Sequence, residues 1–443
     1  MSALKDGIEQ LRRYPSAVAG AMIIVFLLSL AGYTMFAIPY GDALDKWRGG
    51  AQWQEHPINA RPAWVNWFRA DTLPGTIRVT PDDAQTVREP FTGGERVQMV
   101  LDLDYNYAEF PSELNLFIHS QFADLEPFVR MTWLTPDGRQ IPMGGRRVGR
   151  DDRVSISQDW NLERRLGGLP HVQLLADPTA DDPPQVLQGT YRLQVDAILF
   201  EPDAEIDLRL VSYGRVHGIA GTDHQRRDLR VALLWGTPIA LAFGLIAAVG
   251  TTITTLIIAA TGVWFGGWID ALIQRITEVN MILPMLPILV MVGTLYSTSI
   301  WLMLGVVVAL GIFSAGIKMY RAMLLPIREA PYIEAARAYG VGNARIILRY
   351  MIPRVLPVLI PGFVTLIPTF VFLEASLAVL GLGDPELPTW GKVMNDAQTQ
   401  SALYHGYYYW VIGPAFLLML TGLGFAMLGF ALDRVFNPRL RMI

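Results

Sequence analysis

Acidic side chains with the spacing of a metal site occur in the first half of the chain. Four oxygen ligands fall on the first, third, fifth and twelfth positions of a calcium-binding loop: Asp102, Asp104, Asn106 and Glu113. Tyr107 stands where the sharp turn of such a loop needs glycine, and Leu101 and Leu103 alternate with the acids as strand residues do. The pattern therefore favours a strand, with a calcium loop as the alternative.

Other residue types that carry chemistry are scattered or missing. The six histidines show no ligand spacing: His56, His119, His171, His217, His224 and His405. The absence of cysteine excludes disulfides, thiolate metal sites and cysteine nucleophiles. No Gly-x-x-x-x-Gly-Lys-Ser/Thr phosphate loop occurs. We expect no metal, no cofactor and no catalytic residue, and nothing in this chain should bind or hydrolyse nucleotide.

The composition indicates two environments. With 52% hydrophobic residues, the chain is too apolar for an ordinary soluble protein and too charged to lie entirely in lipid. Its 36 basic and 40 acidic residues nearly balance, so no electrostatic field favours binding to nucleic acid.

Long stretches without charge predict membrane-spanning helices. No charged residue lies between Arg13 and Asp42, and a helix of that length exceeds the ~30 Å hydrocarbon core. The stretch 281–317 is too long for one span, so it should fold back near residues 296–299. With the first helix, the expected spans number six: 15–39, 231–269, 281–317 as two helices, 355–380 and 408–432.

Between the first two spans, the sequence predicts a β-rich domain. Period-two alternation at Val97–Leu103, Tyr191–Val195 and Glu205–Tyr213 is typical of strands, and Pro136-Asp137-Gly138 within 128–141 predicts a hairpin. A β-sandwich-like domain fits best. The expected segments are an N-terminal segment at 1–14, the first helix at 15–39, the β-rich domain at 40–216 and the remaining membrane helices at 217–443.

The distribution of Lys and Arg predicts the orientation. Basic residues precede the first span and follow the last: Lys5, Arg12, Arg13, Arg434, Arg439 and Arg441. Residues 318–354 hold seven basic side chains against Glu329 and Glu334, whereas the loop after the fifth span has Lys392 against three acids. By the positive-inside rule, both termini are expected in the cytoplasm of a plasma (inner) membrane protein, with the β-rich domain outside.

Two membrane features have competing interpretations. Glu374 is an acid inside an expected span, where it costs about 3 kcal/mol or more at the bilayer centre unless it faces protein or water. We favour a structural bond near the outer helix end over contact with a transported substrate. The aromatic run 407–410 is typical of an interfacial belt, with the lining of a substrate entrance as the alternative.

One cytoplasmic segment has the pattern helix, glycine, helix, proline. Gly340 suits the left-handed position after a helix, Asn343 can cap the next helix, and Pro353 marks entry into the fifth span. Ala335 and Ala336 are small enough to let another protein approach the backbone closely. Such a helical pair could transmit force.

This segment resembles the EAA signature of binding-protein-dependent permeases. Glu334-Ala335-Ala336 is followed by three residues, Gly340, nine residues and Tyr350-Met351-Ile352-Pro353. The signature ends in Ile-x-Leu-Pro, so Tyr350 and Ile352 depart from it while preserving the helix-to-proline geometry.

Other landmarks resemble the dipeptide, oligopeptide and nickel group of these permeases. Gly221-Thr222-Asp223 is similar to the start of that group's Gly-Thr-Asp-x-x-Gly-Arg-Asp entry, with Arg226 replacing the second glycine. The segments 374–383 and 388–391 are similar to the group's exit from the fifth helix. The resemblance covers residues 218–439 well and leaves the large β-rich insertion unexplained.

The resemblance implies a type I ATP-binding-cassette (ABC) importer permease with six membrane helices. Its implied partners are a second permease, forming a heterodimer, two cytoplasmic ATPase subunits and an extracytoplasmic binding protein. Within segment 318–354, the implied ATPase-coupling residues are Glu334, Ala335, Ala336, Arg337, Gly340, Arg345 and Pro353. Residues of the translocation path or of helix packing are Glu374, Trp390 and Gly391.

Three function classes compete. We favour a permease for peptides or a similar small solute. The alternatives are a membrane-anchored receptor or scaffold whose β-rich domain binds a partner, and an ion-coupled transporter, which usually needs several ionisable groups inside the membrane. The insertion itself could dock the binding protein or cap the translocation path.

Overall fold

The computed structural model describes residues 14–82, 86–180 and 183–436, in two compact units. The helical unit comprises the residues up to Arg48 and those from Val231 onward, and the β-rich unit comprises Gly49–Arg230. The basic residues expected to flank the spans at 5, 12, 13, 439 and 441 lie outside the described residues.

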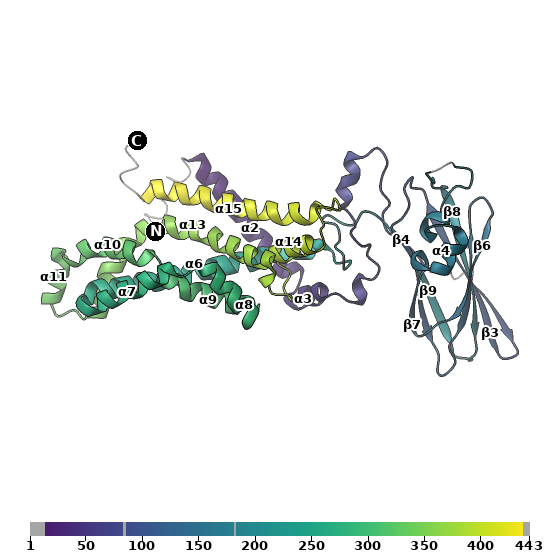
Figure 1. The fold of residues 1–443 in the computed structure, drawn as a ribbon, viewed down its shortest axis with the longest axis horizontal. Coiled ribbons are helices and arrows are strands. Elements are labelled where there is room, and N and C mark those ends of the chain that lie inside the picture. The colour runs from purple at the N-terminus through teal and green to yellow at the C-terminus, as the bar shows by residue number, and fades with distance from the viewer. Residues whose placement is uncertain (1–13, 83–85, 181–182, 437–443) are drawn as a thin grey trace. The chain divides into compact units, whose positions relative to one another are not determined.

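The helical unit combines long helices with several short ones (Figure 1). Its helices are α2 (Pro15–Ala37), α3 (Tyr40–Arg48), α6 (Leu229–Phe265), α7 (Gly267–Ile282), α8 (Met285–Leu295), α9 (Ile300–Ile312), α10 (Gly316–Arg328), α11 (Pro331–Ala338), α12 (Asn343–Arg345), α13 (Ile352–Leu377), α14 (Trp390–Thr399) and α15 (Tyr409–Phe436). Two wide turns of π-helix, η5 (Ile346–Met351) and η6 (Ala378–Leu382), flank α13.

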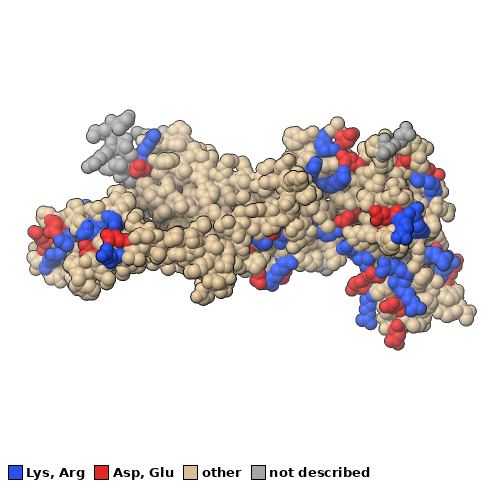
Figure 2. Space-filling view, viewed as in Figure 1, with Lys and Arg blue, Asp and Glu red and all other residues tan. Residues whose placement is uncertain are grey.

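The polytopic helical architecture is confirmed, although two spans are bent. Among the described residues, four helical stretches are long and apolar enough to cross a membrane, and two helix pairs pass the same test with bends of 76° (α7 with α8) and 45° (α9 with α10). The chain breaks at 296–299, where the sequence predicts a turn. Figure 2 shows a broad surface without charge over these helices, and charged side chains gathered around α10 and α11.

The boundary between the second and third spans was predicted wrongly. The second helix ends at Phe265, because Gly266 and Gly267 adopt φ of 62° and 52°, which only glycine reaches without strain. The next helix, α7, begins at once, so the last residues of the expected span 231–269 belong to α7. Asp270 of α7 forms an ion pair with Arg321 of α10, with 2.6 Å between carboxylate and guanidinium.

Glycines allow α2 and α15 to approach each other closely. A Cβ atom on Gly20 of α2 would lie 2.8 Å from the carbonyl oxygen of Gly424 on α15, and one on Gly424 would lie 2.7 Å from Ile23. Backbone-to-backbone contact of this kind increases van der Waals packing, which is the main attraction between helices in lipid.

The β-rich unit is an antiparallel sandwich of two sheets. The four-stranded sheet has the order β1 (Ile77–Val79), β9 (Glu205–Tyr213), β4 (Glu113–Gln121), β7 (Asp151–Ser155). The five-stranded sheet has the order β2 (Val87–Phe91), β3 (Gly94–Tyr105), β8 (Gly189–Leu199), β5 (Phe128–Leu134), β6 (Gln140–Arg147). The remaining elements are the short helices η1 (Ala51–Trp53), η2 (Ala63–Phe68), η4 (Ile156–Gln158), α4 (Trp160–Leu166) and α5 (Pro170–Gln173).

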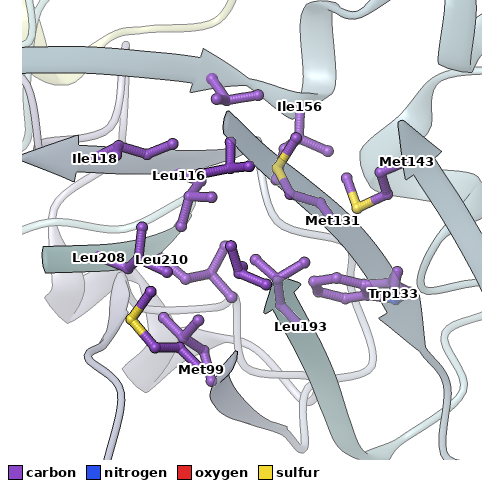
Figure 3. Close-up of a cluster of buried hydrophobic side chains, with 14 of the residues drawn as sticks. Met99, Leu116, Ile118, Met131, Trp133, Met143, Ile156, Leu193, Leu208 and Leu210 are labelled. Atoms are coloured by element: carbon purple, nitrogen blue, oxygen red, sulfur yellow. The ribbon is translucent and has the colours of Figure 1, made fainter. Parts of the chain in front are cut away.

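Alternate residues of both sheets form one core (Figure 3). Along β9, exposed and buried positions alternate until the last four residues, which are all buried. Trp133 of β5 is fully buried and donates its indole N–H to the carbonyl of Leu174, 3.1 Å away. The core therefore gives the indole N–H of Trp133 a partner while burying the apolar faces of both sheets.

The strand predictions are confirmed. The predicted stretches lie within β3 and β8, the third coincides with β9, and β5 and β6 form the predicted hairpin. The candidate calcium ligands Asp102 and Asp104 lie on β3, where Arg192 donates to Asp102 at 2.7 Å and Thr190 to Asp104 at 2.6 Å. Cross-strand partners on β8 thus occupy both carboxylates.

The boundaries of the β-rich unit differ from the expected residues 40 and 216. Ala43 and Trp47 of α3 are buried within the helical unit. The turn after Val216 belongs to the β-rich unit, since the amide of Ala60 donates to the hydroxyl of Thr222 at 2.9 Å.

Replacing the central tryptophan tests the sandwich core. Trp133→Ala should lower the free energy of unfolding of the β-rich unit by about 3–5 kcal/mol, because it leaves a cavity and an unpaired carbonyl. Proteolysis of the full chain in rising urea measures this. Trp160→Ala, at a ring that is 59% exposed, is the control and should cost under about 1 kcal/mol. Equal effects would contradict the core assignment.

Candidate functional site

The EAA segment folds as a short helix followed by a glycine turn. Pro331 begins α11, where its missing N–H is harmless, and the helix ends at Ala338. Gly340 has φ of 75°, and the amide of Val341 donates to the carbonyl of Ala336 at 3.0 Å. The predicted left-handed glycine is thus present, and it turns the chain towards α12.

The two faces of α11 differ. Ile333 is fully buried and Ala336 is 7% exposed, whereas Glu334 and Ala335 are exposed and Tyr339, just past the helix, is 89% exposed. Ala336 therefore packs inward, and the expectation that it presents backbone to another protein does not match its burial. Tyr339 was missed from the sequence, although it directly precedes the signature glycine.

The buried face of α11 joins a core at the ends of three membrane helices. This core contains Leu256, Ala259, Ala260, Val263 and Trp264 of α6, Ile317, Tyr320 and Leu324 of α10, and Val355 and Leu359 of α13, together with Ile333, Ile346, Ile347 and Met351. The guanidinium of Arg337 lies 4.2 Å from the centre of the Trp264 ring. Any displacement of α11 must therefore displace these helix ends, because close-packed cores transmit strain.

A wide turn connects this segment to α13. From Asn343 to Leu382 the helix is continuous, and the predicted stop at Pro353 is absent. Instead, η5 forms a π-helical turn immediately before Pro353, which stands in the first turn of α13. Such π-turns occur often at functional sites. Arg345 lies on the exposed surface of this connection.

The other predicted residues form a second, separate group near α14 (Figure 1). Glu374 is 6% exposed and the hydroxyl of Thr389 donates to it, while Trp390 is 1% exposed. A Cβ atom on Gly391 would lie 2.9 Å from the backbone of Ala375. Burial of all three predicted residues supports a role in helix packing.

Trp390 locks α14 against α6. Its indole N–H donates to the carbonyl of Leu233 at 3.0 Å, and a Cβ atom on Gly236 would lie 2.3 Å from the indole ring. Lys392 and Asp396 pair at 2.5 Å along the same short helix. The sequence did not predict this helix, which is only ten residues long and lies outside the apolar spans.

Comparison with known proteins places the helical unit in a family. The family model "Binding-protein-dependent transport system inner membrane component" matches residues 241–442. A glutathione transport system permease protein of Pectobacterium atrosepticum is 32% identical over 225 residues, which are 50% of this chain and 72% of that protein. This chain belongs to the permeases of binding-protein-dependent ABC importers.

Two further relatives agree with this membership. A dipeptide transport system permease protein of Alkalihalophilus pseudofirmus is 29% identical over 226 residues, covering 50% of this chain and 72% of the relative. A putative peptide permease protein of Brucella suis is 30% identical over 220 residues, covering 49% and 72%. The family match begins at residue 241, after the β-rich unit, so this ABC permease carries the sandwich as an addition to the family's region.

At the turn before α6, this ABC permease departs from its group's pattern. Arg226, which stands at the position of a glycine, has φ of 65°, a conformation that costs a non-glycine residue about 1–2 kcal/mol. The carboxylate of Asp223 holds the turn by accepting from Arg227 at 2.6 Å. The positive φ explains why the group has glycine at this position. An arginine here needs contacts that offset the backbone strain.

The side chain of Arg226 supplies that compensation through the β-rich unit. It donates to Glu113 of β4 and to the carbonyl of His56, both at 2.6 Å, and lies 4.6 Å from the ring centre of Tyr213. Both Arg226 and Glu113 are nearly buried. The arginine thus connects Glu113, the first residue of β4, to the turn that precedes Leu229 and α6.

A histidine pair borders the same cluster. The rings of His56 and His217 lie 4.3 Å apart, and burial, followed by the charge of His217, lowers the pKa of His56 to about 4. Burial also lowers the pKa of His217. Both rings are therefore neutral at pH 7, which avoids adding positive charge beside Arg226.

Two substitutions separate the backbone and side-chain roles of Arg226. Arg226→Ala should destabilise the β-rich unit by about 3 kcal/mol or more, because Glu113 loses its buried partner. Arg226→Gly should cost about 1 kcal/mol less than Arg226→Ala, since glycine accepts the positive φ. Urea-dependent proteolysis of the full chain measures both. If Arg226→Gly were as stable as the wild type, the side-chain contacts would only offset the backbone strain of about 1–2 kcal/mol, which would contradict the larger contribution expected here.

Proposed function

We propose that this permease subunit forms half of the translocation path of an ATP-driven importer for peptides or a similar small solute. The chain belongs to the ABC importer permeases, which are translocation subunits and not enzymes. The substrate class rests on the relatives described above, which are named as permeases for dipeptides, glutathione and peptides. The receptor alternative has no comparable support.

The proposed coupling to ATPase subunits depends on the two faces of α11. Glu334 and Ala335, with the projecting Tyr339, offer a narrow surface that fits a groove of a partner. The burial of Ile333 against α6, α10 and α13 is the observation that carries the proposal, because it connects that surface to the membrane helices. Ala336, Arg337 and Pro353 support the surface, and Arg345 borders it.

Membrane arrangement and partners are part of the same proposal. If each bent pair counts as one span, the chain crosses the membrane six times. The ring of Tyr14 lies 5.9 Å from the guanidinium of Arg434, which supports placing the start of α2 and the end of α15 on one side. With the basic segment 318–354, this side is the cytoplasm of a plasma (inner) membrane. A second, different permease, two ATPase subunits and a binding protein complete the importer.

Alanine substitutions in the coupling segment test the proposal. Gly340→Ala should weaken ATPase association and uptake about fivefold or more, since left-handed alanine costs about 1 kcal/mol and misdirects the turn. Glu334→Ala and Tyr339→Ala should weaken both by removing side chains at the contact. Co-purification of the ATPase subunits and uptake in vesicles are the measurements.

Matched controls exist within the chain. Gly342 has φ of −64° and open space around it, so Gly342→Ala should leave coupling unchanged. Tyr404 is 91% exposed, as accessible as Tyr339, and Tyr404→Ala should also have no effect. If Glu334→Ala and Gly340→Ala retained both uptake and ATPase association, the coupling assignment would be wrong.

We assign docking of the binding protein to the sandwich. Its four-stranded sheet carries a hollow of about 620 Å³ lined by polar side chains that include His119, Asp152 and Arg209. Surfaces of mixed charge suit reversible contact between folded proteins, where charged pairs set orientation and encounter rate. Capping of the translocation path is the alternative role.

A deletion of the sandwich distinguishes these roles. The backbones of Gly75 and Gly214 touch, since a Cβ atom on Gly214 would lie 2.5 Å from the carbonyl carbon of Gly75. Joining Gly75 directly to Gly214 therefore removes residues 76–213 without stretching the chain. We expect weaker association with the binding protein and unchanged ATPase association. Unchanged docking would overturn the assignment and favour the cap.

A further inference from the structure

Four apolar side chains of the β-rich unit project into solvent together. Trp64 is 41% exposed, Trp67 83%, Phe68 80% and Ile219 68%. The indole N–H of Trp64 donates to the carbonyl of Ile219 at 3.0 Å, which connects the two stretches of chain. We call these four residues the aromatic patch. Large exposed apolar side chains that cluster mark an interaction site.

The aromatic patch is held in a fixed conformation. Its three aromatic residues lie on η2, where Arg69 donates to the carbonyl of Asn66. The side chain of Asn66 bonds to both the amide and the carbonyl of Leu73, each at 3.0 Å. The amide of Ala63 donates to the carbonyl of Gly218 at 2.8 Å. The patch is therefore organised before it meets any partner.

The patch lies close to the start of a membrane helix. Leu229, the first residue of α6, donates its amide to the carbonyl of Gly221 at 3.1 Å, although eight positions separate them in sequence. Ile219 is two residues from Gly221. Given about 3.8 Å between consecutive Cα atoms, Ile219 lies within about 15 Å of Leu229.

We propose that the aromatic patch inserts into the headgroup region of the bilayer, at the membrane surface where α6 enters. Tryptophan is enriched at membrane–water interfaces because its ring is apolar and its N–H is polar. Phe68 and Ile219 add side chains that favour the acyl boundary. The patch thereby fixes the height of the β-rich unit at the membrane, independently of which solute is transported.

Charges around the patch complement anionic lipid headgroups. Arg69 and Arg215 flank it and share Glu109, at 2.7 and 2.5 Å, and Arg61 precedes Trp64 by three residues. Three basic side chains against Glu109 and the nearby Asp71 leave an excess of one positive charge. Aromatic rings bordered by arginine are suited to a phospholipid surface, to which basic side chains are attracted.

Single labels test lipid contact directly, because the chain has no cysteine of its own. Phe68→Cys carrying a nitroxide is placed in the full chain, assembled with its partner subunits in nanodiscs of phosphatidylethanolamine and phosphatidylglycerol. The label should be more accessible to oxygen than to a water-soluble nickel chelate, by several-fold over the control. Trp160→Cys, at another exposed aromatic residue of the same unit, is that control. Ile219→Cys provides a second position within the patch.

Each outcome decides the proposal. Preference for oxygen over the nickel chelate at both Phe68 and Ile219 supports insertion into the bilayer. Equal accessibility to nickel at Phe68 and Trp160 would show that the patch faces water and would overturn the proposal. Protection from both reagents at Phe68 would show a protein contact, with the second permease or the binding protein, and would also overturn it.

Discussion

The hydrocarbon core of a membrane offers no hydrogen bonds, and this constraint organises the helical unit. Wherever a helix breaks or contains proline, backbone groups lose their partners, at a cost of several kcal/mol for each unsatisfied group. In this permease, side chains from other helices satisfy several such groups. The amide of Asn280 donates to the carbonyls of Leu310 and Phe313, at 2.8 and 3.0 Å, where α9 gives way to α10.

The same principle explains why α14 lies where it does. Pro238 interrupts the bonding of α6, and the first carbonyls of that helix accept from outside it: Trp390 donates to Leu233, and the hydroxyl of Thr34 on α2 approaches Leu234 at 3.5 Å. At the π-turn after α13, the amide of Asn395 donates to the carbonyl of Val379 at 3.0 Å. The short helix α14 is therefore a source of donors for irregular backbone.

The β-rich unit is stabilised in a different way. A sandwich is surrounded by water, and burial of the apolar side chains between its sheets stabilises it. Its strands could be predicted because alternation with period two is written directly in the residues, as in 205–213. The contacts of Arg226 could not be predicted, because its partners Glu113 and His56 lie far away in sequence. The one available signal in the sequence was Arg226 itself, which replaces a glycine of the family pattern.

The sequence by itself determined the helical and β-rich parts, the break at 296–299, the position of Gly340 and membership of the permease family. These follow from local periodicity, charge and glycine stereochemistry, which need no knowledge of distant contacts. Only the tertiary structure decided that Ala336 packs inward while Tyr339 projects, that Glu374 and Trp390 are buried, and that α7 begins at Gly267. The physical reason is that burial and repair of irregular backbone depend on which helices become neighbours, and residues such as Trp390 and Leu233 meet only after the chain has folded.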